Sequence, residues 1–474
     1  MKKEKMFIHA FNIGANCYIY DVNTDKILEV PEKVYEVLKK IPDYEEVLQI
    51  RDKEVRAYIL NLIEHGFLKA DRVQITEHPE SKYVNSYINN NMTSVILQVT
   101  QNCNLRCEYC VYSGSYYNRV HNNKRMSLET AMAAIDYLAE HSSDTDVLHI
   151  GFYGGEPLLE FDLIKECVSY AKRRCNGKQL YYNLTTNGTL VTKEIVEFFL
   201  ENNVLMMFSL DGPKEIHDLS RRSSSNQGSF EKLLSNIIKM IKEEYPEYFS
   251  KKVSFNTVLN PERSYSCVSD YISGEELLKN NVFMSSLINT HNSKKRTQVS
   301  ERFMEELRYE EFLLLLSKIE QYPKEKLSPL SRPRGMELDS LRFEKNLIGR
   351  ERIPQKAHHG GPCVPGNYRI FVDVDGNFYP CERVSETSEE MKIGNLKEGI
   401  DKKQVIKIMN IEKLTEKECH NCWAYDYCNV CAANLDTSTS DPKRALLEEC
   451  KSIRKSVEDK FKDYCVLKMY DYQR

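Results

Sequence analysis

The feature that most constrains the fold is an alternation of short apolar segments with longer amphipathic segments between residues 94 and about 320. Strand candidates lie at 94–99, 147–153, 180–186, 204–210 and 253–259, with helix candidates such as 127–141, 161–174 and 191–202 between them. This alternation predicts an α/β fold in which right-handed crossovers join parallel strands, as an open sheet or as a full or partial barrel. In each arrangement, reactive groups belong at the carboxyl ends of the strands.

Conspicuous residues follow four of these strands at the points where the strands end. Three cysteines follow the first strand, GGEP (154–157) the second, TNG (186–188) the third and LDGP (210–213) the fourth. Because the carboxyl ends of parallel strands meet on one side of a sheet, the four loops are expected to converge. We therefore predict that the active site lies on that face.

Composition limits the expected partners and compartment. The chain has 474 residues, 41% of them hydrophobic and 29% charged, which is enough for about two to four domains. A formal net charge of −4 gives no overall basic excess, so neither nucleic acid nor a membrane surface is an expected partner. The polar N-terminus does not resemble a signal peptide, and no apolar stretch reaches the ~18 residues of a membrane span. We expect a cytoplasmic protein.

The chain contains fifteen cysteines, which in a reducing compartment indicate metal binding or catalysis more than disulfides. Cys103, Cys107 and Cys110 lie in one loop with gaps of three and two residues. Closed zinc sites and 4Fe–4S clusters both normally take four protein ligands. A cluster held by these three cysteines would leave one iron open to an exogenous molecule.

The CxxxCxxC spacing of this loop, with Tyr109 before the last cysteine, resembles the signature of radical S-adenosylmethionine (radical SAM) enzymes. The resemblance implies that the open iron chelates S-adenosylmethionine, which on reduction yields a 5′-deoxyadenosyl radical that abstracts hydrogen. It also implies a partial (β/α)6 barrel over 93–320. The residues that it assigns to S-adenosylmethionine are Gly154, Gly155 and Glu156 for the methionine amine, and Ser209 with Arg221 or Arg222 for the ribose or carboxylate.

A second set of cysteines lies near the end of the chain. The CxxC, five-residue gap and CxxC of 419–431 would alone fit a zinc ribbon or an iron–sulfur site. The wider spacing resembles the SPASM domain, which implies such a domain over 363–474 and two auxiliary 4Fe–4S clusters, three clusters in all. The implied ligands are Cys363, Cys381 and Cys431 for the first auxiliary cluster, and Cys419, Cys422, Cys428 and Cys450 for the second. The first cluster would keep an open iron or be completed by Cys465.

Elements around these cysteines are also predicted. Asp375 and Gly376 suit a tight turn between two strands, and a helix is expected over 442–461. Residues 321–362, rich in Pro, Arg and Lys, are expected to form an irregular bridge between domains.

The first 70 residues predict a small module of strands followed by helices. Strand candidates lie at 6–11, 16–22 and 26–30, helix candidates at 31–41 and 54–66, and the polar residues 71–92 are expected to form a linker. The module is winged-helix-like and resembles the precursor-peptide recognition module of maturases that act on ribosomally made peptides. In those enzymes the leader peptide pairs with an edge strand.

The order of module, barrel and SPASM region is most similar to maturases of cysteine-rich peptides, of the sactipeptide or ranthipeptide type. The resemblance implies a thioether-forming enzyme whose partners are a precursor peptide and an electron donor such as flavodoxin or ferredoxin. An alternative is an anaerobic sulfatase-maturing oxidase, with Glu382 in the place of the proposed catalytic base. Carbon–carbon crosslinking and epimerisation of a peptide remain open. A non-catalytic scaffold is disfavoured because it needs no GGEP loop.

Overall fold

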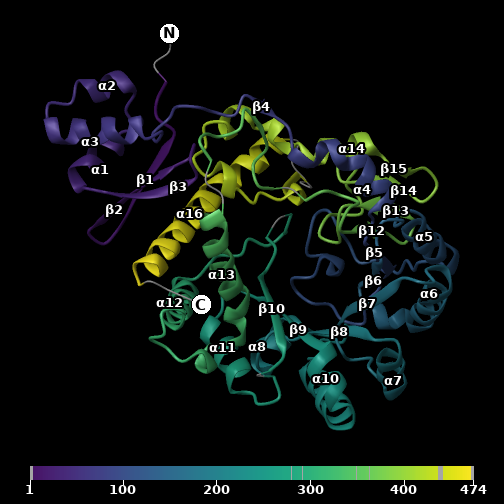
Figure 1. The fold of residues 1–474 in the computed structure, drawn as a ribbon. Coiled ribbons are helices and arrows are strands. Elements are labelled where there is room, and N and C mark those ends of the chain that lie inside the picture. Colours follow the sequence, from purple (N-terminus) through teal and green to yellow (C-terminus); the bar gives the residue numbers. More distant parts are fainter. Residues whose placement is uncertain are drawn as a thin grey trace.

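The structure, a computed structural model, describes residues 4–278, 280–290, 292–347, 350–361, 363–435 and 441–470. Its central feature is a sheet of six parallel strands in consecutive order, which curves through the lower half of the molecule in Figure 1. The strands are β5 (Ser94–Thr100), β6 (Val147–Gly154), β7 (Gln179–Thr186), β8 (Val204–Ser209), β9 (Val253–Leu259) and β10 (Val282–Leu287). This arrangement confirms the predicted α/β partial barrel.

Helices connect these strands on the outside of the sheet (Figure 1). They include α5 (Leu128–Glu140), α6 (Phe161–Arg174), α7 (Lys193–Glu201), α8 (Lys214–Ser220), α9 (Phe230–Ser235), α10 (Pro246–Lys252) and α11 (Tyr265–Gly274), and α12 (Glu301–Lys318) follows the last strand. Ser127 caps α5 by accepting a hydrogen bond from the Thr130 amide, and Thr192 caps α7 in the same way. β10 was missing from the strand candidates because its apolar run is only three residues long, 282–284, and polar residues flank it; of its six residues, Phe283 alone is buried.

The C-terminal region extends the barrel sheet. β12 (Ile370–Val372) pairs in parallel with β5, and β13 (Asn377–Tyr379), β14 (Gly394–Asn395) and β15 (Gly399–Ile400) follow in antiparallel order. The predicted turn joins β12 to β13, and Gly376 there adopts a positive φ of 84°. α14 (Lys402–Met409), α15 (Glu416–Cys419) and the long α16 (Pro442–Met469) complete this region, so the predicted terminal helix extends beyond 461.

The N-terminal residues form an antiparallel sheet of β1 (Ile8–Ile13), β2 (Asn16–Asp21) and β3 (Lys26–Val30), with β2 in the centre. The helices are α1 (Glu32–Leu38), α2 (Tyr44–Leu48) and α3 (Lys53–Glu64). Side chains of β2 alternate between two cores: Cys17 and Ile19 pack with the helices, whereas Tyr18 and Tyr20 pack toward α16. The small sheet is therefore covered on both faces, and α16 lies against it in Figure 1.

The segment 71–92 contains ordered elements where the sequence predicted a linker. β4 (Ile75–Thr76) pairs with β11 (Lys356–Ala357), and α4 (Val84–Asn90) buries Val84 and Ile88 in the main core. Their four-residue spacing is helical, but the surrounding Asn and Ser residues hide it.

Residues 321–362 contain a helix, α13 (Arg332–Leu347), which lies beside α16 (Figure 1). Pro333 is tolerated there because it occupies the first turn, where its missing N–H has no intrahelical partner. Among the described residues, no helix is both long enough and apolar enough to span a bilayer.

Candidate functional site

The three cysteines of the CxxxCxxC motif lie in the loop that follows β5. Burial raises the pKa of Cys103 and of Cys107 to about 12, and the nearby thiols of the same loop contribute to both shifts. The pKa of Cys110 is raised as well, chiefly by burial. Three neighbouring thiols with raised pKa values are poor anions by themselves, whereas a bound metal cluster would stabilise all three thiolates. The donor set therefore fits an iron–sulfur cluster with three protein ligands.

The two glycines of GGEP allow β6 to approach the cysteine loop closely. The Gly155 amide donates to the Thr100 carbonyl and the Glu156 amide to the Asn102 carbonyl, each at 2.9 Å. A Cβ added to Gly154 would lie 1.9 Å from the Thr100 oxygen, and one added to Gly155 would lie 2.1 Å from the Asn102 oxygen. Only glycine fits at these two positions, because any side chain would collide with the backbone that leads into the cysteines.

The Glu156 carboxylate joins the ends of β6 and β7. It is 1% exposed and accepts hydrogen bonds from Thr186 Oγ1 at 2.7 Å, the Asn187 amide at 2.8 Å and the Leu158 amide at 3.1 Å. Asn187 in turn donates to Asn104 Oδ1, at 2.8 Å, in the cysteine loop. The TNG segment therefore fixes the loop after β6 and the cysteine loop relative to each other. The Glu156 carboxylate already accepts three hydrogen bonds.

A buried ion pair follows β8. Arg221 Nε lies 2.8 Å from Asp211 Oδ2, and both side chains are under 10% exposed. Asp211 also accepts hydrogen bonds from the Tyr109 hydroxyl and from the Val258 amide. The Arg221 charge lowers the pKa of Cys107 against the larger effect of burial. Asp211 thus holds Arg221 near the cysteine loop. Sequence reasoning did not single out Asp211, although it lies in the LDGP loop. Ser209 is buried at the end of β8.

The seven C-terminal cysteines lie in two groups, within each of which neighbouring thiols interact electrostatically. The first cysteine group comprises Cys363, Cys381 and Cys431, and the charge of Cys431 contributes to the raised pKa of Cys363 and of Cys381. The second cysteine group comprises Cys419, Cys422, Cys428 and Cys450, and the charge of Cys422 contributes to the raised pKa of each of the other three. Desolvation is the largest cause of the raised values in both groups. Cys465 is buried instead in the aromatic core around Phe461, between α16 and the N-terminal sheet.

Glu382 lies beside the first cysteine group, directly after Cys381 in the chain. Its carboxylate pairs with Arg369 at 3.2 Å, and its charge raises the pKa of Cys381, though burial has the larger effect. The pKa of Tyr153 on β6 is raised by burial first, and then by the charges of Glu382 and Cys110 among others. Tyr153 therefore lies within electrostatic range of both the cysteine loop and Glu382.

A buried polar network ties the barrel to the C-terminal region. Arg119 pairs with Glu386 at 2.6 Å, with both side chains under 10% exposed. Tyr112 donates to Glu386 Oε1 at 2.7 Å, and Gln98 donates to the Tyr112 hydroxyl at 2.8 Å. Sequence reasoning missed this network because its members carry no motif and because the contacts to Glu386 join residues more than 250 positions apart.

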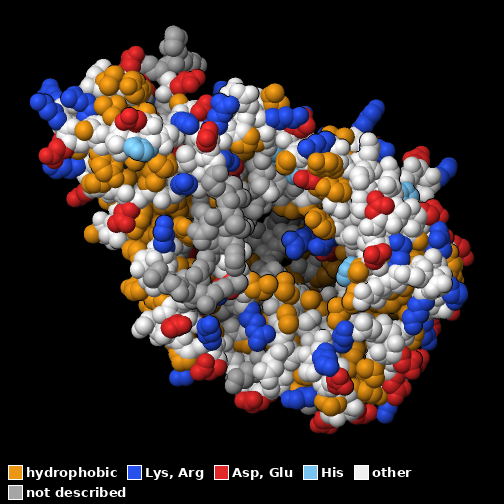
Figure 2. Space-filling model, viewed as in Figure 1, with side chains coloured by type: hydrophobic (Ala, Val, Ile, Leu, Met, Phe, Trp, Pro, Cys, Tyr) orange, Lys and Arg blue, Asp and Glu red, His pale blue; other side chains and the backbone are white. Residues whose placement is uncertain are grey.

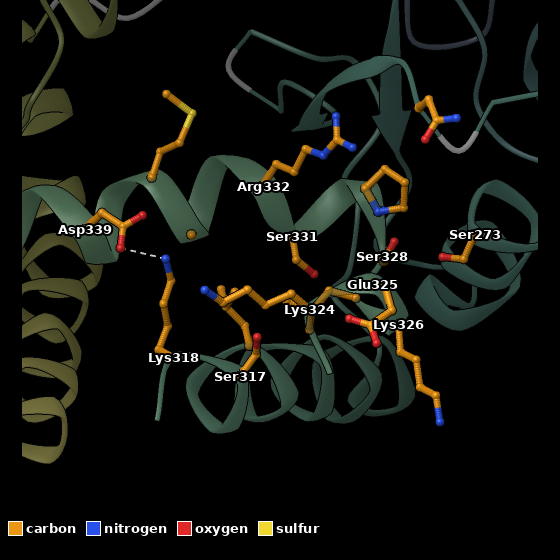
Figure 3. A pocket seen from close by; sticks show the side chains of 16 residues that line it. Ser273, Ser317, Lys318, Lys324, Glu325, Lys326, Ser328, Ser331, Arg332 and Asp339 are labelled. Atoms are coloured by element: carbon orange, nitrogen blue, oxygen red, sulfur yellow. Dashed lines mark hydrogen bonds and ion pairs between the residues drawn. The ribbon is translucent and has the colours of Figure 1, made fainter. Parts of the chain in front are cut away.

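Two cavities differ in their relation to these residues. A cavity of about 160 Å³ lies at the carboxyl ends of β9 and β10 and is lined by Tyr109, Tyr116, Asn260 and Ile288 among others. A larger cavity, of about 630 Å³, lies between α12, α13 and the 324–331 segment (Figure 3). Figure 2 shows a hollow in one face of the molecule, bordered by hydrophobic and basic side chains. The smaller cavity adjoins the cysteine loop, whereas none of the predicted site residues lines the larger one.

Comparison with known protein families identifies the domain that bears the cysteine loop. Residues 97–272 match the radical SAM superfamily, a range that includes the cysteine loop, GGEP, Asp211 and Arg221. This part of the chain is a radical SAM domain, and its parallel α/β unit is the radical SAM fold.

The chain is similar to particular members of that class. It is 25% identical to a cysteine-type anaerobic sulfatase-maturating enzyme of Clostridium perfringens, over 78% of this chain and 96% of that relative. It is 34% identical to the enzyme of the same description from Clostridium novyi, but this match spans 31% of this chain and less than half, 39%, of that relative. The radical SAM cyclopropyl synthase TigE of Paramaledivibacter caminithermalis is 25% identical over 49% of this chain and 52% of its own length.

Solved structures show the same fold. Native anSMEcpe with bound AdoMet has a TM-score of 0.55 and 20% identity, covering 80% of this chain and 100% of that chain. The same protein with AdoMet and the Kp18Cys peptide has a TM-score of 0.54, with coverage of 80% and 99%.

Proposed function

We propose that this chain is a radical SAM peptide maturase that installs thioether crosslinks in a ribosomally made, cysteine-rich precursor peptide. In this proposal the 5′-deoxyadenosyl radical would take a hydrogen atom from a carbon of the peptide, and a core cysteine, having lost its thiol proton to solvent, would bond through sulfur to that carbon. The one electron left over would pass to an auxiliary cluster held by the C-terminal cysteines. The precursor peptide and a flavodoxin or ferredoxin are its partners, and the reaction takes place in the cytoplasm.

The proposed cofactors have distinct sets of ligands on the chain. Cys103, Cys107 and Cys110 would hold a 4Fe–4S cluster that, when reduced, supplies the electron for cleavage of S-adenosylmethionine to the hydrogen-abstracting radical. The two C-terminal cysteine groups would hold one auxiliary cluster each.

The chain's own residues position the site. Gly154 and Gly155 bring backbone polar groups against the cysteine loop, where they would hold the methionine amine together with Glu156. Since the Glu156 oxygens already accept hydrogen bonds from the β6 and β7 loops, we assign this carboxylate mainly to fixing those loops. Arg221 and Ser209, on the β8 side, would face the ribose or carboxylate.

The packing of the N-terminal sheet is the observation that best supports a peptide substrate. The face of β2 that bears Tyr18 and Tyr20 packs against the segment containing Cys419, Cys422 and Trp423. The N-terminal module therefore contacts the segment that bears the second cysteine group. β3 lies at the edge of the three-stranded sheet. An edge strand of this kind can pair with an extended leader peptide through backbone hydrogen bonds.

The first test is cleavage of S-adenosylmethionine by the anaerobically reconstituted full-length protein under strong reductant. We expect 5′-deoxyadenosine, and we expect Cys107→Ser to abolish it. The matched control is Cys267→Ser, at an exposed cysteine outside all three groups. Absence of cleavage in the wild-type protein with intact clusters would refute an enzymatic role.

The second test concerns the product. A short cysteine-rich reading frame next to the coding sequence would provide the peptide, and mass spectrometry should detect a loss of two hydrogens per crosslink. Prior alkylation of the core cysteines should abolish this loss. A mass change that is unaffected by alkylation would refute thioether formation.

Sulfatase-type oxidation is the second candidate, favoured by one observation: the charge of Glu382 acts both on Cys381 and on Tyr153 of the barrel strand β6. A carboxylate in this position could accept a proton from a substrate serine or cysteine. A sulfatase-derived peptide with a cysteine at the modified position distinguishes the candidates. Its oxidation by the wild-type protein, and loss of that activity in Glu382→Gln, would favour this alternative.

A further inference from the structure

The cysteine loop runs antiparallel to the segment that follows α8, and this pairing sets Arg221 directly opposite Cys107. The two amides that flank Cys107 donate to the two carbonyls that flank Arg221. These bonds run from Arg106 to Arg222 at 2.6 Å and from Glu108 to Ser220 at 2.9 Å. Because residues directly opposite each other in antiparallel pairing carry neighbouring side chains, the pairing places a guanidinium beside one of the three cysteines.

The Arg221 charge acts on the thiols of the loop from a buried position. Arg221 is 6% exposed and Cys107 is 7% exposed. The guanidinium carbon also lies 5.4 Å from the centre of the Tyr109 ring. Burial raises the pKa of Cys107 and of Cys110, and the Arg221 charge lowers both values. Since water is largely excluded here, salt and solvent screen this charge only weakly.

Asp211 holds the guanidinium in place and supplies the opposite charge. Its Oδ2 atom accepts hydrogen bonds from Arg221 Nε at 2.8 Å and from the Tyr109 hydroxyl, and its Oδ1 atom accepts one from the Val258 amide at 3.0 Å. The Asp211 charge raises the pKa of Cys107, but by less than the Arg221 charge lowers it. The pair therefore acts on Cys107 with a net positive effect.

A chain of hydrogen bonds fixes the backbone of both members of this pair. The Asp211 amide donates to His217 Nδ1 at 3.4 Å, and His217 Nε2 lies 3.0 Å from Ser229 Oγ. The Ser229 hydroxyl donates to the Arg221 carbonyl at 3.0 Å, so its oxygen is left to accept from His217. The fold, and not a bound molecule, therefore sets the positions of the two charges.

We propose that Arg221 and Asp211 together set the reduction potential of the 4Fe–4S cluster in the cysteine loop, an inference that rests on the proposed function. Reduction transfers one electron to the cluster from a flavodoxin, a ferredoxin or a chemical reductant, and so adds one negative charge. A neighbouring cation stabilises the reduced form and raises the potential, whereas a neighbouring anion lowers it. Arg221 thus favours uptake of the electron, and Asp211 limits this effect.

A potentiometric titration followed by electron paramagnetic resonance tests the proposal. The full-length protein is reconstituted anaerobically and titrated without S-adenosylmethionine, and the signal of the cysteine-loop cluster is the one that Cys107→Ser lacks. Arg221→Gln should lower the midpoint potential of this signal, and Asp211→Asn should raise it, because the two variants remove opposite charges. A general loosening of the site would move both variants in the same direction.

Two controls separate charge from shape and from distance. Arg221→Lys keeps the charge, so its potential should stay closer to that of the wild type than the potential of Arg221→Gln does. Lys214→Gln removes a positive charge from the same helix, α8, but from a half-exposed side chain paired with Glu231, and should leave the potential unchanged.

Unshifted potentials in both Arg221→Gln and Asp211→Asn, or shifts in the same direction, would overturn the proposal. If one of these variants does not retain the cluster, the sign of the shift in the other decides. Absence of the signal from the wild-type protein would refute the proposed function, and this inference with it. Opposite shifts without cleavage of S-adenosylmethionine would support the inference and refute only the proposed function.

Discussion

Replacement of Gly155 by alanine tests whether the close approach of β6 to the cysteine loop builds the site. The new Cβ would lie 2.1 Å from the Asn102 carbonyl oxygen, whereas real Cβ atoms essentially never come within 3.0 Å of such an atom. The strand must therefore move by about 1 Å or more. That shift breaks or lengthens the hydrogen bonds from Gly155 to Thr100 and from Glu156 to Asn102. With about 1 kcal/mol lost per bond and a further penalty for the buried groups left unpaired, we expect a destabilisation of about 2–4 kcal/mol.

The measurements are the melting temperature and the rate of 5′-deoxyadenosine formation by the reconstituted protein. A cost of this size corresponds to a fall of about 5–15 °C for a barrel of this length, and the cleavage rate should fall at least tenfold because the displaced backbone carries the cysteine loop. Gly274→Ala is the control: its Cβ would meet no atom within 4 Å, so we expect a change below about 1 kcal/mol. Wild-type melting and cleavage in Gly155→Ala would refute the steric argument.

Three further predictions follow from buried groups. Glu386→Ala leaves the Arg119 charge buried without its partner, so it should lower the free energy of unfolding by about 3–5 kcal/mol. Glu231→Ala breaks an exposed ion pair and should cost at most about 1 kcal/mol. Equal destabilisation by the two variants in thermal unfolding would contradict this prediction. Phe461→Ala removes a fully buried ring that contacts both the N-terminal sheet and the Trp423 segment, so unfolding should become easier by about 3–5 kcal/mol and limited proteolysis should cut between 71 and 92 sooner. Burial lowers the pKa of His217 from 6.5 to about 4, so as the pH drops below 6.5 the unfolded chain binds the proton before the folded chain does, and the free energy of unfolding falls. His217→Gln should remove about 1.4 kcal/mol of this loss at pH 5.5. A melting temperature with the same pH dependence in the variant as in the wild type would contradict this prediction.

The predictable part of the site rests on local spacing. The gaps between Cys103, Cys107 and Cys110 hold the three thiols within one loop, and the glycines of GGEP mark a backbone approach that no other residue allows. Helical and strand periodicity likewise predicted five of the six parallel strands. Each of these features depends on residues a few positions apart, so the sequence displays it directly.

The remaining features depend on contacts between distant segments. β12, three residues long, joins the barrel sheet beside β5 because backbone pairing needs no sequence motif. The Arg119–Glu386 pair likewise joins the cysteine loop to the C-terminal region only in the folded chain.

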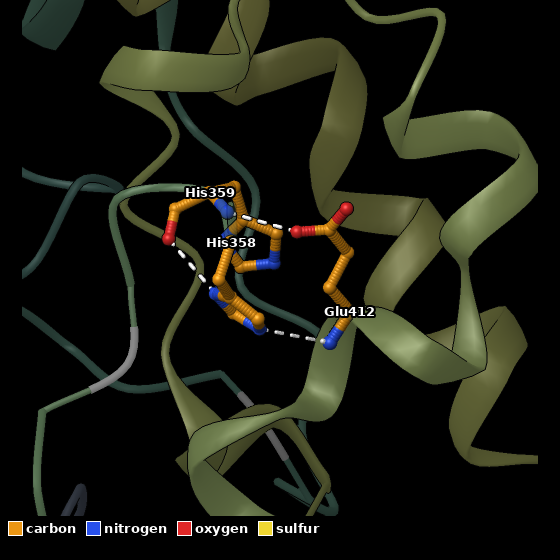
Figure 4. A group of neighbouring side chains, drawn as sticks. All are labelled: His358, His359 and Glu412. Atoms are coloured by element: carbon orange, nitrogen blue, oxygen red, sulfur yellow. Dashed lines mark hydrogen bonds between the residues drawn. The ribbon is translucent and has the colours of Figure 1, made fainter. Parts of the chain in front are cut away.

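Sequence alone therefore determined the chemistry-bearing loops and the α/β class, since these follow from short-range spacing. Only the tertiary structure decided how the sets are held together, which face of the N-terminal sheet meets Trp423, and that His359 and Glu412 share one buried, hydrogen-bonded cluster (Figure 4). The physical reason is that burial and hydrogen-bond partners across hundreds of residues are set by packing, which local periodicity does not encode.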